Sequence, residues 1–211
     1  MQCSLYRLLR IVAVLGFLLA PSLATAQQTG NSILVLGDSI SAAYGMSLQE
    51  GWVALLERQI AQDHPGTVVV NSSISGETTG GALRRLPALL EEHEPTLVIV
   101  ELGGNDGLRG FPLSAFRDNL SELARVSQGA GAAVLFLPME IPPNYGSRYT
   151  RGFRESFTLV AETSGSQLAP FILEDVAVHP ELMQDDGIHP KASAQQTMLD
   201  AVYPAILEAL P

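Results

Sequence analysis

Short uninterrupted apolar runs alternate along the chain with longer segments in which apolar residues recur every three or four positions. Runs of the first kind are typical of strands buried on both faces of a parallel sheet, and the second pattern is typical of helices packed on that sheet. The apolar runs predict strands at 33–36, 68–70, 97–100, 134–137 and 171–173. The periodic segments predict helices at 51–62, 79–92, from an N-cap at Ser114 to Gly129–Gly131, at 152–164 and at 191–210.

The alternation of strands and helices predicts a single α/β domain, in which helices cover both faces of a parallel sheet. Such sheets bind ligands at the carboxyl ends of their strands. Three predicted strands are followed directly by polar segments, at 37–39, 71–76 and 103–106. We expect the parallel sheet to bring these segments to one edge, within reach of the polar segment 185–189 before the last helix.

Residues 1–26 have the features of a secretory signal peptide. Arg7 and Arg10 precede an apolar run at 11–20, and Ala24-Thr25-Ala26 has the small-x-small pattern of a cleavage site. The alternative is a membrane anchor, but the apolar run is about half of the ~20 residues that a membrane-spanning helix requires. We therefore predict cleavage and no stable membrane anchor.

Composition and charge narrow the class of the remaining domain, residues 27–211. The chain carries 12 Lys and Arg against 22 Asp and Glu, a formal net charge of −10, which argues against nucleic acid as a partner. Its one cysteine, Cys3, lies within the predicted signal peptide, so no intramolecular disulfide can form. A domain without thiols suits the periplasm or the exterior. We expect a monomer.

Ser39, at the end of the first strand, is the candidate nucleophile. A serine hydroxyl has a pKa far above neutrality and needs a base, for which an imidazole is best suited at pH 7. His189 and Asp186 supply the base and an orienting carboxylate, because a spacing of three lets the two side chains face each other. Acyl transfer also needs donors for the developing oxyanion, and the candidates are the N–H groups of Ser39 and Gly76 and the side-chain amide of Asn105.

Other readings of these residues remain open. Asp38 fits a simple turn-forming role, and Asp185 competes with Asp186 as the carboxylate. His179 is the rival base, whereas His64 and His93 are predicted in loops at the opposite sheet edge. A metal site formed by the acidic pair with His189 and His179 is a further alternative, although calcium and magnesium need more oxygen ligands than this segment supplies.

Four blocks of the chain resemble those of the GDSL/SGNH hydrolases: Gly37-Asp38-Ser39, Gly76, Gly103-x-Asn105-Asp106 and Asp186-x-x-His189. Longer stretches resemble the bacterial periplasmic thioesterase I/protease I/lysophospholipase group, whose members are often called arylesterases: 36–44, 71–78, 100–111 and 183–190. The likeness runs through almost all of residues 27–211. The G-x-S-x-G elbow of other hydrolases is absent around Ser39.

The resemblance implies a three-layer αβα sandwich of flavodoxin-like fold around a five-stranded parallel sheet. It implies Ser39 as nucleophile, His189 as general base and then acid, Asp186 as its partner, and an oxyanion hole formed by Ser39, Gly76 and Asn105. It further implies hydrolysis of small-molecule carboxylic esters and acyl-thioesters through an acyl-enzyme on Ser39. Neither a metal nor an organic cofactor is implied.

Two loops bear on the substrate. The resemblance suggests that Gly107–Pro112 is mobile beside an acyl pocket, and the sequence predicts a second loop at 138–150. Arg109 either contacts a substrate head group or points into solvent, and Tyr145 either lines the pocket or packs the loop. The alternative activity is O-acetyl esterase action on a carbohydrate or peptidoglycan, which the low aromatic content of 6% disfavours. A binding module without catalysis is the non-enzymatic alternative.

Overall fold

A computed structural model describes residues 31–211, so the predicted signal peptide at 1–26 lies outside the described residues. One parallel sheet has its strands in the order β2-β1-β3-β4-β5, which is the flavodoxin-like order. The strands are β1 (Ser32–Gly37), β2 (Val68–Asn71), β3 (Leu97–Glu101), β4 (Ala133–Phe136) and β5 (Gln167–Leu168). The predicted fold class is thus confirmed.

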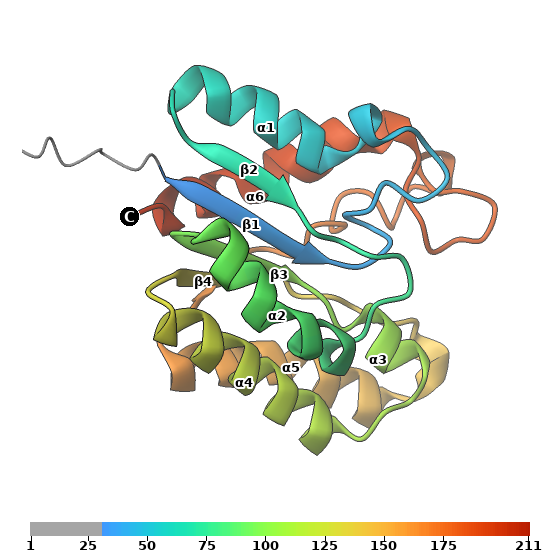
Figure 1. The fold of residues 1–211 in the computed structure, drawn as a ribbon. Helices are drawn as coiled ribbons and strands as arrows, with labels where there is room; N and C mark the ends of the chain where they lie inside the picture. The colour runs from blue at the N-terminus through green and yellow to red at the C-terminus, as the bar shows by residue number, and fades with distance from the viewer. Residues whose placement is uncertain (1–30) are drawn as a thin grey trace, which may run out of the picture.

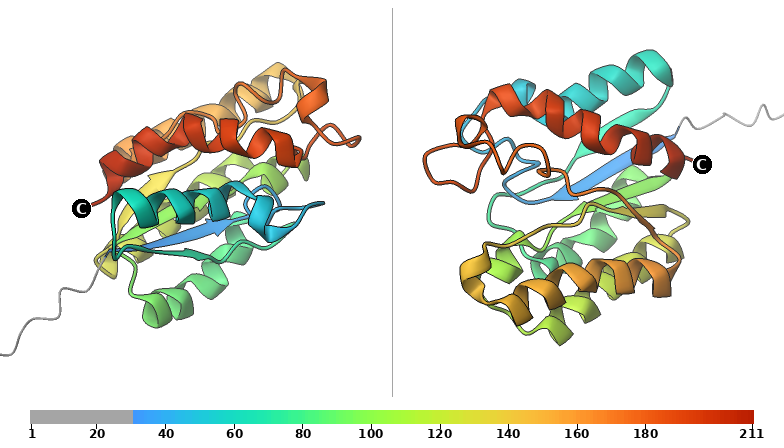
Figure 2. Two further views of the ribbon diagram at one scale, coloured as in Figure 1. Left: turned by 90° about the horizontal axis from the view of Figure 1, so that it is seen from above. Right: turned by 180° about the vertical axis from the view of Figure 1, so that it is seen from behind.

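Helices cover both faces of the sheet and complete a three-layer sandwich (Figures 1 and 2). On one face α1 packs against α6, and on the other α4 packs between α2 and α5. The α-helices are α1 (Trp52–Asp63), α2 (Thr79–His93), α3 (Gly104–Leu108), α4 (Leu113–Gly129), α5 (Ser147–Ser164) and α6 (Gln195–Ala209). Within the described residues no helix has both the length and the apolar character needed to cross a membrane.

The central strands are apolar along most of their length because both of their faces are covered. Every residue of β3 is buried, and in β1 the residues from Ile33 onward are buried too. By contrast β2 lies at the sheet edge, and Val68 is 57% exposed. This difference explains why a run that is continuously apolar predicts a central strand more firmly than an edge strand.

The strand register places the predicted polar segments at one edge of the sheet. In the parallel ladders Val35 pairs with Asn71 and Gly37 pairs with Glu101, so the turns that follow β1, β2 and β3 emerge side by side. These are the carboxyl ends of the strands, where a ligand site is expected.

The predicted fifth strand at 171–173 is wrong. The strand that pairs with β4 is Gln167–Leu168, and residues 171–173 follow it in a turn. Ile172 and Leu173 are buried in that turn, so their apolar character reflects burial rather than strand pairing. A short apolar run does not by itself distinguish these two cases.

Helix boundaries also differ from the prediction at several points. Ser114 is not an N-cap, because α4 begins at Leu113 and Pro112 holds the N-cap position, with a φ of −58° and a ψ of 131°. The predicted loop 138–150 ends early, since α5 begins at Ser147 directly after Gly146. Two smaller corrections are that α6 begins at Gln195 after a short 3₁₀ turn, and that His93 is the last residue of α2 rather than a loop residue.

Candidate active site

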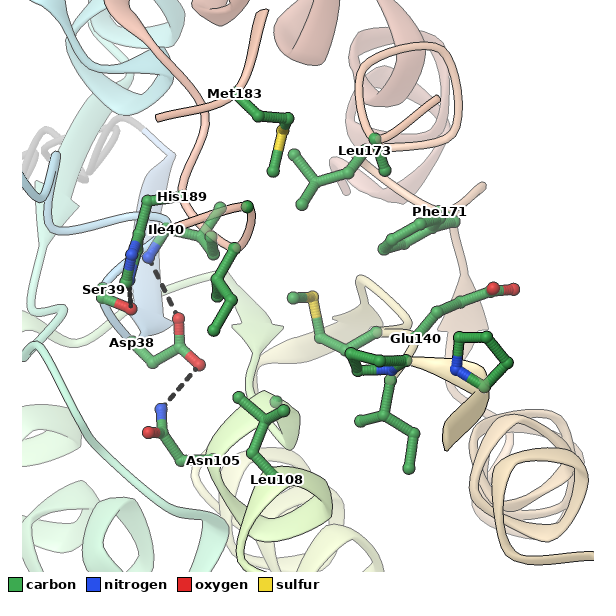
Figure 3. Close-up of a pocket in the computed structure, with 18 residues that line it drawn as sticks. Asp38, Ser39, Ile40, Asn105, Leu108, Glu140, Phe171, Leu173, Met183 and His189 are labelled. Atoms are coloured by element: carbon green, nitrogen blue, oxygen red, sulfur yellow. Dashed lines mark hydrogen bonds between the residues drawn. The ribbon is translucent and has the colours of Figure 1, made fainter. Parts of the chain in front are cut away.

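Ser39 lies in the tight turn that follows β1. The turn folds back at once, because the Ala42 N–H donates to the Asp38 carbonyl at 2.9 Å. Gly37 permits this path, since a Cβ at that position would lie 2.7 Å from the Cβ of Ser41. Ser39 is half-buried and faces a cavity, as Figure 3 shows.

His189 is held on a short hairpin between Leu182 and Lys191. The Gln184 N–H donates to the His189 carbonyl at 2.7 Å, and the Lys191 N–H donates to the Leu182 carbonyl at 2.7 Å. The side-chain amide of Gln184 also donates to the carbonyl of Tyr44, at 2.8 Å. That bond ties the histidine hairpin to the turn that carries the serine.

The structure brings Ser39, His189 and Asp186 into one chain of polar contacts. His189 Nε2 lies 2.9 Å from Ser39 Oγ, and His189 Nδ1 lies 2.7 Å from Asp186 Oδ2. The other carboxylate oxygen accepts the backbone N–H groups of Ile188 and His189, at 2.9 and 3.0 Å. In this arrangement the imidazole can accept the serine proton while the carboxylate stabilises the resulting cation.

The hydrogen bonds to Asp186 favour its ionised form. The backbone N–H of His189, its ring and the backbone N–H of Ile188 together lower the pKa of Asp186 from 3.8 to about 2. The carboxylate is therefore charged throughout the neutral range. The Tyr44 ring also contacts the imidazole, with its centroid 4.2 Å from that of His189 and the ring planes tilted by 33°.

The three predicted oxyanion donors are placed unequally. Asn105, at the start of α3, lines the same cavity as Ser39, and its Nδ2 donates to Asp38 Oδ2 at 3.1 Å. Gly76 lies in the loop between β2 and α2 with a φ of +79°, and it is not among the residues that line the cavity. Its carbonyl accepts a hydrogen bond from Arg109 Nη2 at 3.0 Å. Within the described residues the N–H groups of Ser39 and Gly76 donate to no other protein group.

Two buried carboxyls lie beneath the serine turn. Glu101 Oε2 accepts from the Ser41 hydroxyl at 2.7 Å and from the Asp38 N–H at 3.3 Å. The Trp52 indole N–H in turn donates to the Ser41 hydroxyl at 3.1 Å. Burial raises the pKa of Asp38 from 3.8 to about 6, and burial together with the nearby Asp38 raises the pKa of Glu101 well above its ordinary value. Burial thus disfavours the ionised form of both carboxyls.

The cavity beside Ser39 measures about 520 Å³ and is mostly apolar. Its walls come from the serine turn, α3, the segments after β4 and β5, and the histidine hairpin (Figure 3). Its apolar lining residues are Ile40, Leu108, Met139, Ile141, Pro142, Pro143, Phe171, Leu173, Ala177, Met183 and Ile188. Such a lining suits a hydrocarbon chain whose polar end reaches Ser39.

The structure also places the residues that the sequence left open. His179 lies 3.3 Å from Glu181, and Tyr145 donates to the Leu108 carbonyl at 2.8 Å, so neither lines the cavity. Arg109 is exposed, as one of its two predicted roles requires, and its Nη2 donates to the Gly76 carbonyl at 3.0 Å; contact with a substrate head group stays a prediction. Gly107–Pro112 is only partly a loop, since Gly107 belongs to α3. Among the described residues no cluster of three His, Cys, Asp or Glu side chains suits a metal ion.

Sequence reasoning missed Glu101 and Gln184. A signal for Glu101 exists, because it is the one charged residue in the run Leu97–Glu101 and sits where the strand meets a polar turn. Gln184 offers no such signal, since its partner Tyr44 lies 140 residues away. The turn-forming role of Asp38 is present, as the Ile40 N–H donates to its Oδ1 at 3.0 Å, but its contact with Asn105 was not foreseen.

Comparison with known proteins gives consistent matches over nearly the whole described chain. The GDSL-like lipase/acylhydrolase family model matches residues 35–197. Esterase TesA of Pseudomonas aeruginosa is 47% identical over 89% of this chain and 94% of its own. Thioesterase 1/protease 1/lysophospholipase L1 of Escherichia coli K12 is 42% identical over 88% of each chain. The crystal structure of esterase EstA from Pseudoalteromonas, inhibited by monoethylphosphonate, superposes with a TM-score of 0.81 at 48% identity and covers 84% of this chain and 97% of its own.

Proposed function

Because this chain belongs to the GDSL-like lipase/acylhydrolase family, we propose that it is a serine esterase that hydrolyses carboxylic esters and acyl-thioesters of small molecules. One observation carries the proposal. Ser39 Oγ, the two ring nitrogens of His189 and the Asp186 carboxylate form a continuous series of contacts of 2.9 and 2.7 Å at the mouth of an apolar cavity.

The mechanism follows from this geometry. His189 Nε2 takes the proton of Ser39 as its Oγ attacks the ester or thioester carbonyl, and Asp186 stabilises the imidazolium. The Ser39 and Gly76 N–H groups and the Asn105 amide stabilise the oxyanion of the tetrahedral intermediate. His189 then protonates the leaving alcohol or thiol, and a water molecule activated by the same imidazole hydrolyses the acyl-enzyme.

The cavity favours an acyl chain over a sugar as the group held beside Ser39. Each buried methylene contributes about 0.8 kcal/mol, so kcat/KM should rise with acyl length until the cavity of about 520 Å³ is filled. Trp52, the one tryptophan, is fully buried and donates to Ser41, so it cannot form a stacking platform for carbohydrate. A series of nitrophenyl esters and acyl-thioesters of increasing chain length measures this preference.

The decisive experiment replaces Ser39 by alanine. We expect Ser39→Ala to lower kcat on a short-chain nitrophenyl ester at least ~10³-fold and to abolish labelling by a fluorophosphonate probe. Ser121→Ala is the matched control, because Ser121 is exposed on α4 and does not line the cavity. Retention of most of the activity, or of probe labelling, in pure Ser39→Ala protein would contradict the proposal.

We also propose that the protein acts in the periplasm or outside the cell as a monomer. Arg7 and Arg10, the apolar run at 11–20 and the Ala24-Thr25-Ala26 site support removal of residues 1–26 as a signal peptide. Mass spectrometry of the exported protein should find an N-terminus at Gln27. An N-terminus at Met1 in the exported protein would refute the cleavage.

A further inference from the structure

Asp38 joins the turn that carries Ser39 to the side chain of Asn105. Its Oδ1 accepts the Ile40 N–H at 3.0 Å, and its Oδ2 accepts an Asn105 Nδ2 hydrogen at 3.1 Å (Figure 3). We propose that Asp38 is a positioning residue that fixes the orientation of the Asn105 amide in the oxyanion hole. The inference rests on the proposed function, since it assigns Asp38 a role through one of the three oxyanion donors.

The chemistry of an amide explains why Asn105 needs such a partner. A side-chain amide presents an NH₂ group on one side and a carbonyl oxygen on the other, and rotation by half a turn exchanges them. Only the NH₂ orientation stabilises an oxyanion, because the carbonyl oxygen would repel it. An ionised carboxylate accepts hydrogen bonds and donates none, so Asp38 binds the NH₂ side alone and leaves its second hydrogen available.

The position of Asp38 is itself closely determined. The residue is 2% exposed, and the bond from the Ile40 N–H fixes its carboxylate as part of the serine turn. Gly104, which precedes Asn105, has no side chain between the turn and α3, and a Cβ there would lie 3.4 Å from Asp38 Oδ2. A displacement of the serine turn would therefore be passed directly to Asn105, which couples the nucleophile to the oxyanion donor.

The charges around Asp38 decide whether it can act as an acceptor. Burial and Asp106 from α3 disfavour its ionisation, and the bonds from Ile40 and Asn105 and the nearby His189 favour it. Glu101 from β3 also faces Asp38, and burial raises its own pKa well above the ordinary value. With its pKa raised to about 6, mainly by burial, Asp38 is mostly ionised at pH 7. Below pH 6 Asp38 becomes protonated and can donate as well as accept, so it no longer selects the NH₂ side of the amide alone.

The first test is the isosteric substitution Asp38→Asn. Asparagine offers one acceptor where two are needed, so either the Ile40 N–H or the Asn105 NH₂ must face another donor. We expect kcat on a nitrophenyl ester to fall ~10²–10³-fold with KM changed less than about threefold, which corresponds to the loss of one oxyanion donor. In an Asn105→Ala background the same substitution should lower kcat by less than about threefold, because its target is already gone.

Asp106→Asn is the matched control. Asp106 is as deeply buried as Asp38 and adjoins Asn105, but its carboxylate accepts from the backbone and hydroxyl of Thr79 instead. Its effect on kcat should be the same in the wild-type and Asn105→Ala backgrounds. If Asp38→Asn also lowers kcat equally in both backgrounds, its role is only structural and the proposal is overturned.

A second measurement needs no substitution at Asp38 and no activity. The ¹⁵N resonance of the Asn105 side chain should shift between pH 8 and 4.5 with a midpoint at or above about 6, in His189→Ala protein where the imidazole titration is absent. Absence of this shift would overturn the proposal even if Asp38→Asn failed to fold. Failure of the proposed function would look different, since Asn105→Ala and Ser39→Ala would then retain wild-type activity while the resonance still titrated.

Discussion

Replacement of Gly103 by alanine should destabilise the protein by about 2–6 kcal/mol and displace Asn105, the proposed oxyanion donor that follows it. Gly103 has a φ of +116°, outside the regions that an L-residue adopts at low energy, and this conformation costs alanine about 1–3 kcal/mol. A Cβ would also lie 2.8 Å from two ring carbons of Phe116 and 3.2 Å from one of Phe157. Overpacking of this kind costs a further ~1–3 kcal/mol.

The neighbouring rings have little freedom to yield. Phe116 stacks on Phe153 at a centroid distance of 4.8 Å, and Phe157 packs edge-on against both, at 5.3 and 5.5 Å. All three rings are almost fully buried. The strain should therefore move the backbone at Gly103, which lies two residues before Asn105, and lower kcat as well as stability.

Urea unfolding of the pure proteins measures the effect. Gly129→Ala is the control, because no heavy atom lies within 4 Å of a Cβ at that position and its φ is not positive. It should change the free energy of unfolding by less than about 1 kcal/mol. In Phe116→Leu protein the ring is absent, so Gly103→Ala should lower the free energy of unfolding by less, the difference being about the ~1–3 kcal/mol assigned to overpacking. A loss below about 1 kcal/mol for Gly103→Ala, or no relief from Phe116→Leu, would refute this reasoning.

Two further predictions concern the buried and exposed carboxylates. Asp186→Asn keeps an oxygen for the backbone N–H groups but removes the charge facing His189. We therefore expect kcat to fall about 10³-fold with little change in KM. A loss below about tenfold would contradict the role proposed for Asp186. Asp38, with a pKa raised from 3.8 to about 6, takes up its proton in the folded state before the unfolded state as the pH falls. When the pH is lowered from 7 to 4.5, the free energy of unfolding of the wild-type protein should therefore rise by about 2 kcal/mol relative to that of Asp38→Asn. Equal pH dependence in the two proteins would refute the shift. Asp186, whose pKa is lowered, affects stability only below about pH 4.

Much of the fold could be predicted because its signals are local. The runs 33–36 in β1 and 97–100 in β3 are apolar at every position, and this identifies central strands without reference to the rest of the chain. The weaker predictions failed where burial comes from a turn. Phe171–Leu173 is apolar because it lines a cavity and the core, and no periodicity in three residues separates that from a strand.

The candidate site divides in the same way. Asp186 and His189 lie three residues apart, so their facing geometry is a local property that sequence spacing alone predicts. The sequence also marks Ser39 and Asn105 as polar residues at strand ends. It does not give the distance between Ser39 Oγ and His189 Nε2, which lie 150 residues apart and meet at 2.9 Å only through the packing of the hairpin on the serine turn.

By itself, then, the amino-acid sequence determined the layers, the strand-end segments and the residue types gathered there, because each depends on neighbours within a few positions. Only the tertiary structure decided the partners of Asp38 and Glu101 and the direction in which the pKa of each is shifted. Their pKa values follow from burial and from carboxyls brought together across 63 residues of chain. Desolvation and hydrogen-bond partners are properties of the packed molecule, and no local pattern encodes them.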